Sequence, residues 1–189
     1  MPNWCGNDLS VSGPKEDMNR FIEQAKSKRP TGQEIEPNGN VIEKFEDVAL
    51  SFEKFVPYPY GKWDYDWCVK NWGTKWDACE VNDDGHGNYY FDTAWSPPTE
   101  AVLGMSKCYP TLEFHLAYEE CGCDFSGEYR VRNGEIMEDR NGPYIHTCED
   151  CEKKDDTVKR IEGVDASLSP SCKELREEVE DELLGLEEE

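Results

Sequence analysis

The chain has 189 residues, a length typical of one domain or of one domain with an extension. Its net charge of −22, from 42 acidic and 20 basic residues, disfavours direct binding to the phosphates of DNA or RNA. Hydrophobic residues are only 37%, but seven Phe, nine Tyr and six Trp supply enough bulk for a core, which excludes wholesale disorder. Neither a membrane-spanning apolar run nor a signal-peptide pattern is present, so we expect a soluble intracellular protein without a membrane partner.

The first part of the chain predicts a strand and then a helix. Leu9 and Val11 alternate with polar residues in Asn7–Ser12, as in a half-buried strand. Pro14 is well placed as the first residue of a helix. Four apolar residues then fall on one helical face: Met18, Phe21, Ile22 and Ala25.

The next segment is harder to interpret. A polar loop is expected from Pro30 to Asn40. In Val41–Glu53 the spacing of Phe45, Val48 and Phe52 predicts a short helix, although an extended edge is an alternative. We expect the helix, followed by an extended FVPYP segment.

Four of the six tryptophans lie in Trp63–Trp76. Asp64 or Asp66 can cap a short helix there, and Gly73 is a natural end for it. Such a density of large aromatic rings builds either a core or a recognition surface.

The second half predicts further strands and one helix. The expected elements are strands at 74–81, 88–94, 112–118, 125–131 and 135–138, and a helix at 99–109. Together with the first strand and helix, this order is a split βαβ pattern, which is ferredoxin-like. We therefore predict an α+β fold over residues 1–145, with an antiparallel sheet and helices packed on one face.

Residues 146–189 form an acidic extension with 16 acidic and 6 basic residues. Ser171 and Glu174 make a capping box, which predicts a helix at about 171–186. Its acidic side chains are candidates for binding a partner: Glu174, Glu177, Glu178, Glu180, Asp181 and Glu182.

Three motifs carry a resemblance to a known family. They are MPNWCGN at Met1–Asn7, YDWCVKNWGTKW at Tyr65–Trp76 and FDTAWSPP at Phe91–Pro98. Together they resemble the YubB-type family of phage and plasmid proteins, described as ferredoxin-like and without an assigned activity. The resemblance extends from Met1 to about Asn133. It implies a mobile genetic element, the cytoplasm of a bacterial host cell, and no catalytic residues that could be carried over.

The nine cysteines suggest a metal site. An odd number without a secretion signal favours reduced thiols over a disulfide framework. Two closely spaced pairs could supply four ligands for a structural zinc ion: Cys121, Cys123, Cys148 and Cys151. His146 is a substitute ligand. The C-x-C spacing of the first pair is less common in zinc sites, so free thiols are the competing interpretation.

The tryptophans have two interpretations. They could stack a nucleotide base or another flat ligand while Lys75 contacts phosphate. The residues of such a site would be Trp63, Trp67, Trp72, Trp76 and Trp95. Alternatively they form a core that braces the central insertion against the sheet, and we favour this second interpretation.

Catalysis has little support. Cys79 with His86 or His115 lacks an identifiable third group, and nearby carboxylates are expected by chance in an acidic protein. We expect a non-enzymatic accessory protein that binds, and by doing so inhibits, a basic or nucleic-acid-binding host protein. Anti-defence inhibitors, such as anti-CRISPR or anti-restriction proteins that mimic nucleic acid, are the natural class. The alternatives are a nucleotide-binding module and a structural or assembly protein.

Overall fold

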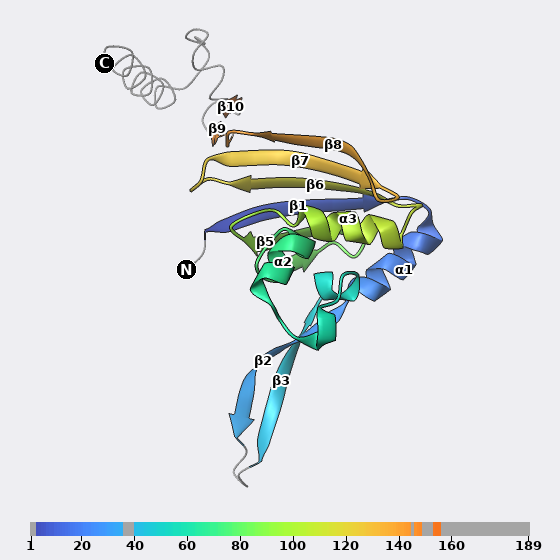
Figure 1. Ribbon diagram of the computed structural model, residues 1–189, viewed down its shortest axis with the longest axis vertical. Helices are drawn as coiled ribbons and strands as arrows, with labels where there is room; N and C mark the ends of the chain where they lie inside the picture. The colour runs from blue at the N-terminus through green and yellow to red at the C-terminus, as the bar shows by residue number, and fades with distance from the viewer. Residues whose placement is uncertain (1–2, 36–39, 145, 149–152, 156–189) are drawn as a thin grey trace, which may run out of the picture.

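The computed structural model describes residues 3–35, 40–144, 146–148 and 153–155. Its centre is a six-stranded antiparallel sheet with the order β4-β5-β1-β6-β7-β8. The strands are β1 (Trp4–Ser12), β4 (Cys79–Asp83), β5 (Asn88–Ala94), β6 (Glu113–Glu120), β7 (Phe125–Arg132) and β8 (Glu135–Gly142). Three helices lie on one side of this sheet (Figure 1), namely α1 (Lys15–Ala25), α2 (Tyr65–Trp72) and α3 (Thr99–Cys108).

The connectivity of the sheet is ferredoxin-like. Along the chain, β1, α1, β4, β5, α3 and β6 form a split βαβ unit, and their strands lie in the order β4-β5-β1-β6. The β7–β8 hairpin extends the sheet beyond β6. The predicted α+β fold, with an antiparallel sheet and helices on one face, is confirmed.

Alternation along β1 shows why one face of the sheet is covered. Its burial pattern changes at every residue, so that Leu9 and Val11 point into the core while Trp4 and Asp8 point outward. Phe21 of α1 lies at the centre of the core, stacked on Phe55 with ring centroids 5.1 Å apart. None of the described helices covers the opposite face of the sheet, which is called the open face below.

Several predicted elements occur close to their expected positions. The first strand and the helix after Pro14 are β1 and α1, and the expected helix at 99–109 is α3. The β7–β8 hairpin turns at Asn133-Gly134, where both residues have positive φ, 54° and 72°. That geometry is the type I′ turn that favours Asn-Gly.

The prediction for residues 30–48 is wrong. Instead of a loop and a short helix, β2 (Ser27–Ile35) and β3 (Val41–Val48) form a separate antiparallel hairpin, called the arm below. Figure 1 shows this arm extending away from the rest of the molecule. Val41 and Phe45 also fit the two-residue period of a strand, and pairing with the mostly polar β2 selects the strand.

After the arm, two short 3-10 turns return the chain to the core. They are η1 (Phe52–Lys54) and η2 (Pro59–Gly61), and Phe52 is fully buried. At the other end of the chain, β9 (His146–Cys148) pairs with β10 (Lys153–Asp155). The predicted helix at about 171–186 lies outside the described residues, and the division of domains at residue 145 stays a prediction. No described helix is both long and apolar enough to cross a membrane.

Candidate functional site

The Trp-rich stretch divides into a buried part and an exposed part. Trp72 is fully buried, and its indole Nε1–H donates to the carbonyl oxygen of Val56 at 2.9 Å. Its ring meets Phe52 edge-on at 5.7 Å and Trp67 at 5.8 Å. Trp72 therefore belongs to the core, and Trp67 packs against it.

The ends of α2 determine which way the flanking residues point. Asp64 caps the helix, because its Oδ1 accepts a hydrogen bond from the backbone N–H of Trp67 at 2.8 Å. Gly73 ends the helix in the left-handed conformation, with φ 83°. A Cβ at this position would lie 2.9 Å from the carbonyl oxygen of Pro97, so only glycine fits without a shift. Before α2 and at its start the chain is exposed, at residues 61–66, whereas Thr74, just after Gly73, is fully buried.

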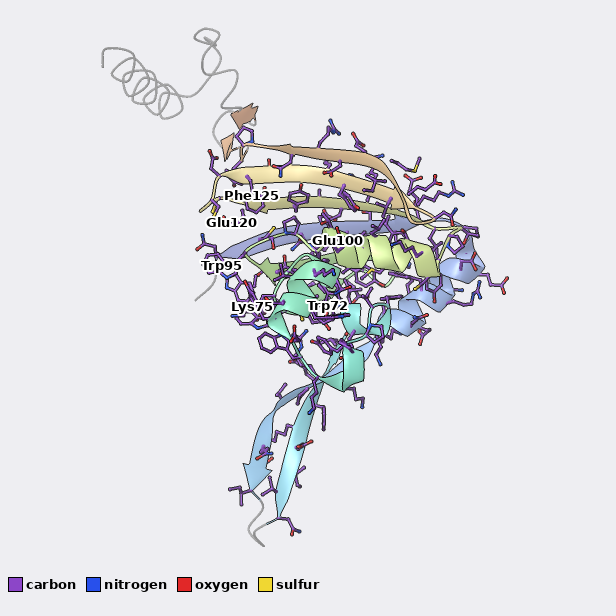
Figure 2. The ribbon with its side chains drawn as sticks, viewed as in Figure 1. Trp72, Lys75, Trp95, Glu100, Glu120 and Phe125 are labelled. Atoms are coloured by element: carbon purple, nitrogen blue, oxygen red, sulfur yellow. The ribbon has the colours of Figure 1, made fainter. Side chains whose placement is uncertain are left out.

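An exposed aromatic patch forms where these ends meet β1 and the end of β5. We define the aromatic patch as Trp4, Trp63, Tyr65, Trp76 and Trp95. Four of its five members are well exposed: Trp4 42%, Trp63 50%, Tyr65 51% and Trp95 50%. Figure 2 shows Trp95 and Lys75 at the same end of the sheet, while Trp72 lies farther inside. Large clustered rings left in contact with water mark an interaction surface more often than chance exposure does.

Lys75 links the rings of the patch. Its ammonium group lies 4.4 Å from the ring centroid of Trp76 and 6.0 Å from that of Tyr65. Both positions are within range of a cation–π interaction. The carbonyl oxygen of Lys75 accepts a hydrogen bond from Nε1 of Trp63 at 3.2 Å. The patch therefore already holds one cation against its rings.

Trp95 is held in an unfavourable backbone conformation. Its φ is 72°, a left-handed value that costs a residue with a side chain about 1–2 kcal/mol. Its N–H donates to the carbonyl oxygen of Asn3 at 3.0 Å, and the hydroxyl of Ser96 donates to that of Gly73 at 2.6 Å. Thr74 binds the carbonyl oxygen of Ala94 at 2.9 Å. These bonds fix Trp95 in position although the conformation is strained, which is typical of functional positions.

The open face beside the patch is acidic. The four strands β4, β5, β1 and β6 contain no Lys or Arg. Six carboxylates on these strands are at least partly exposed outside the core: Asp8, Glu80, Asp83, Asp92, Glu113 and Glu119. The pKa of Asp92 is raised by partial burial and then by the charge of Glu80. This half of the open face therefore presents negative charge without compensating cations of its own.

The other half of the open face is neutralised by ion pairs. On β7 and β8, Arg130 pairs with Glu138 at 3.1 Å, and Arg140 pairs with Glu138 at 2.7 Å and with Glu128 at 2.8 Å. His115 of β6 lies 3.4 Å from Glu128. Partially exposed pairs of this kind contribute little to stability, but they leave less net charge on this side.

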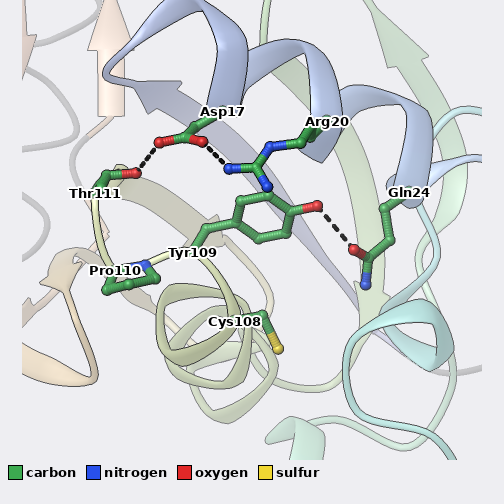
Figure 3. A pocket seen from close by; sticks show the side chains of 7 residues that line it. All are labelled: Asp17, Arg20, Gln24, Cys108, Tyr109, Pro110 and Thr111. Atoms are coloured by element: carbon green, nitrogen blue, oxygen red, sulfur yellow. Dashed lines mark hydrogen bonds and ion pairs between the residues drawn. The ribbon is translucent and has the colours of Figure 1, made fainter.

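A separate open groove of about 320 Å³ lies between α1 and the end of α3 (Figure 3). Its polar groups bind one another. Asp17 accepts a hydrogen bond from Thr111 and pairs with Arg20, and both interactions lower its pKa. The hydroxyl of Tyr109 donates to Gln24 at 2.7 Å. The groove therefore offers a ligand few groups that are not already engaged.

The predicted zinc ligands are only partly described. Cys121 and Cys123 are exposed free thiols in the turn between β6 and β7. The carboxylate of Glu120 accepts hydrogen bonds from the backbone N–H groups of Gly122 and Cys123. A side-chain hydrogen bond from the Cys123 thiol to the same carboxylate raises the pKa of that thiol. Within the described residues, no group of three or more potential ligands is placed to hold a metal ion.

The other pair of predicted ligands cannot be compared with this turn. Cys151 and the side chains of His146 and Cys148 lie outside the described residues. Zinc binding therefore stays a prediction, which metal analysis of the purified protein tests. The six acidic candidates of the extension, from Glu174 to Glu182, also lie outside the described part of the chain.

The groups considered for catalysis have other roles. The thiol of Cys79 donates to the carbonyl oxygen of Asp77 at 3.4 Å, and burial raises its pKa, which disfavours the reactive thiolate. Asp64 caps α2, and Asp77 binds Ser51 and the backbone of Phe52.

Sequence reasoning identified some members of the patch and missed others. Trp63, Trp76, Trp95 and Lys75 were candidates, while the structure places Trp67 and Trp72 away from the exposed rings. Trp4 and Tyr65 were not considered. The outward position of Trp4 follows from the alternation of β1, whose inward residues include Leu9 and Val11, and this signal was present in the sequence.

Comparisons with known proteins agree with the fold. Residues 71–160 match a family model described as a ferredoxin-like domain in Api92-like protein. The crystal structure of a protein, api92, from Yersinia pseudotuberculosis is similar, with a TM-score of 0.51 and 11% identity. The alignment covers 76% of this chain and 98% of that one. No curated protein matches the chain. At this identity the similarity supports the ferredoxin-like fold and does not extend to function.

Proposed function

We propose that this chain is a non-enzymatic binding protein that docks on a basic protein of a bacterial host. The observation that carries the proposal is the aromatic patch lying beside a half-sheet without Lys or Arg. Exposed Trp and Tyr residues are the types that dominate binding energy at protein interfaces. The carboxylates next to them would attract and orient a partner rich in Lys and Arg.

The geometry of the patch favours a protein partner over a base held between two rings. Trp4 and Trp76 have centroids 6.1 Å apart and an interplanar angle of 43°. A flat ring between two others needs parallel rings separated by roughly 7–8 Å, two carbon contact distances. The aromatic rings also come from three separate chain segments, namely the start of β1, residues 63–76 and the end of β5. Cationic side chains of a partner could lie on the exposed rings as Lys75 lies on Trp76.

The cellular role that we propose is inhibition of a host defence. The motifs resemble YubB-type phage and plasmid proteins, and the net charge of −22 would repel nucleic acid while attracting proteins that bind it. Carboxylates placed where such a protein expects phosphates would make this chain a mimic of nucleic acid. An anti-CRISPR or anti-restriction inhibitor fits this combination, and the acidic extension would add to the attraction.

Affinity capture from the natural host tests the proposal. The bait is the full chain, compared with a Trp63→Ala/Trp95→Ala variant and with an Ile136→Ala/Met137→Ala control. The control removes exposed apolar side chains from β8, at the other edge of the sheet. We expect a basic, nucleic-acid-binding protein with the wild type and the control, and a loss of at least ~30-fold in affinity with the patch variant, as for hot-spot residues.

Salt and competition separate mimicry from ordinary docking. Binding should weaken as the salt concentration rises, because screening reduces attraction between opposite charges. The nucleic acid of the captured partner should compete with this chain for it. Capture that does not depend on the patch, or a partner that is acidic or insensitive to salt, would contradict the proposal.

A further inference from the structure

The side chain of Lys75 occupies a position in the aromatic patch that suits a cation from outside. Its ammonium group lies 4.4 Å from the ring centroid of Trp76 and 6.0 Å from that of Tyr65. Tyr65 is 51% exposed and Lys75 is only partly buried, so solvent reaches this position. The negative faces of aromatic rings attract a cation placed over them. The two rings therefore form a cation site that a residue of the chain itself fills.

Only the rings hold this ammonium group. Although the chain has 42 acidic residues, the ammonium of Lys75 forms neither an ion pair nor a hydrogen bond within the part of the chain that the structure describes. Lysine side chains at a surface change rotamer within picoseconds to nanoseconds. The ammonium group can therefore leave the rings without breaking any other described contact.

The backbone around Lys75 stays in place when the side chain moves. The carbonyl oxygen of Lys75 accepts the hydrogen bond from Nε1 of Trp63, and this bond involves no side-chain atom of the lysine. On the preceding residues, the hydroxyl of Thr74 donates to the carbonyl oxygen of Ala94 at 2.9 Å, and that of Gly73 accepts from the hydroxyl of Ser96 at 2.6 Å. The site would thus keep its shape after the lysine side chain has left.

A guanidinium group suits this site better than an ammonium group does. The guanidinium of arginine is planar, stacks on aromatic faces and is weakly hydrated, whereas an ammonium group is strongly hydrated. Exchange of Lys75 for arginine on the ring of Trp76 returns the ammonium to water and removes the less hydrated cation from water. The acidic strands beside the patch attract either cation, so the contact with the ring selects between them.

We propose that the ring of Trp76 binds an arginine side chain of the partner, and that Lys75 covers this site in the free protein. The guanidinium displaces the ammonium group and stacks on Trp76 beside Tyr65. Lys75 is a built-in competitor, which lowers the affinity for arginine and excludes cations that bind the ring more weakly. The inference rests on the proposed docking to a basic protein, since that protein supplies the arginine, and it names the group that is recognised.

The test follows the indole N–H signals of the six tryptophans by NMR in the full-length, ¹⁵N-labelled protein. The probe is N-acetylarginine methylamide, which carries one guanidinium group, and Trp76→Phe assigns the signal of Trp76. We expect a saturable shift of this signal in the wild type. In Lys75→Ala the half-saturating concentration should be about two- to fivefold lower, which corresponds to one cation–π contact at an exposed site.

Two controls separate displacement from a change in overall charge. Lys70→Ala removes the same charge from the exposed side of α2, where Lys70 lies over none of the described rings. It should leave the half-saturating concentration as in the wild type. The citrulline analogue of the probe has nearly the same shape without the charge and should not shift the signal of Trp76.

Three results would overturn the proposal: no saturable shift of Trp76 in the wild type or in Lys75→Ala, weaker binding in Lys75→Ala, or an equal gain in Lys70→Ala. The first would show that the ring binds no arginine, and the second that Lys75 supports the site and does not cover it. Tighter binding in Lys75→Ala together with host capture that yields no basic protein would refute the proposed function alone, because the arginine site is measured without the host partner.

Discussion

Trp72 and Trp95 belong to neighbouring motifs, but the fold uses them in opposite ways. Trp72 is fully buried, in a relaxed helix, with its indole N–H bonded to Val56. Trp95 is half exposed, and its backbone is in a left-handed conformation. The first stabilises the domain, while the second is maintained at a cost in stability. The difference indicates that some tryptophans of this region stabilise the fold, while others are exposed and do not.

The largest expected effect follows from removing the buried ring. Trp72→Ala should lower the free energy of unfolding by about 3–5 kcal/mol, because it leaves a cavity and removes a buried hydrogen bond. Urea denaturation followed by far-UV circular dichroism measures this loss. Trp63→Ala is the matched control on the exposed side and should change the free energy of unfolding by less than ~0.5 kcal/mol. Equal losses for the two variants would remove the distinction between the two groups of tryptophans.

The loop after Trp76 provides the next effect. The carboxylate of Asp77 accepts hydrogen bonds from Ser51 at 2.6 Å, from the backbone N–H of Phe52 at 2.7 Å and from that of Ala78 at 2.8 Å. Asp77→Ala leaves these donors without this acceptor, so we expect a loss of about 2–3 kcal/mol in the free energy of unfolding. The same denaturation experiment measures it, and Asp66→Ala on exposed α2 is the control. A loss as small as that of the control would show that water replaces the carboxylate.

The same carboxyl group predicts a dependence on pH. Burial raises the pKa of Asp77 in the folded state. The unfolded chain releases this proton near the ordinary Asp pKa of about 3.9, whereas the folded state holds it to higher pH. The free energy of unfolding should therefore fall as the pH rises through this interval and stay constant above the folded pKa.

Asp77→Asn isolates this contribution because it has no proton to release. Measured from pH 3 to 7, a range that spans the ordinary Asp pKa of about 3.9, the stability of the wild type relative to Asp77→Asn should decline and then level off. A relative stability that rises with pH would mean that the hydrogen bonds from Ser51 and Phe52 outweigh burial and lower the pKa.

The smallest effect has the opposite sign. Trp95→Gly relieves the left-handed strain, a gain of about 1–2 kcal/mol that the flexibility of glycine partly offsets. We expect a net increase of about 0.5–1 kcal/mol in the free energy of unfolding, together with weaker binding to the host partner. Trp95→Ala keeps the strain and should show no such increase. A destabilised Trp95→Gly would place this side chain in the structural group with Trp72.

The fold was predictable where a single pattern dominated. Leu9 and Val11 alternate over a strand that is covered on one face, and Asn133-Gly134 favours one turn geometry, so both elements lie where expected. The arm was not predictable, because Val41, Phe45 and Val48 have helical spacing and only Val41 and Phe45 also fit the two-residue period of a strand. The partner strand β2 consists mostly of polar residues that resemble a loop in the sequence. Only its pairing with β3 shows that both segments are strands.

The candidate site shows the same division. The local sequence indicated the cap at Asp64, the end at Gly73 and the concentration of tryptophans, because these depend on neighbouring residues and backbone chemistry. Which rings are buried depended on contacts from distant segments, such as Val56 and Phe52 against Trp72. The sequence by itself thus determined the ferredoxin-like order of elements and the acidic character of the protein. Only the tertiary structure gathered Trp4, Trp76 and Trp95 on one surface, because burial is decided by what packs on a residue and not by its neighbours in the chain.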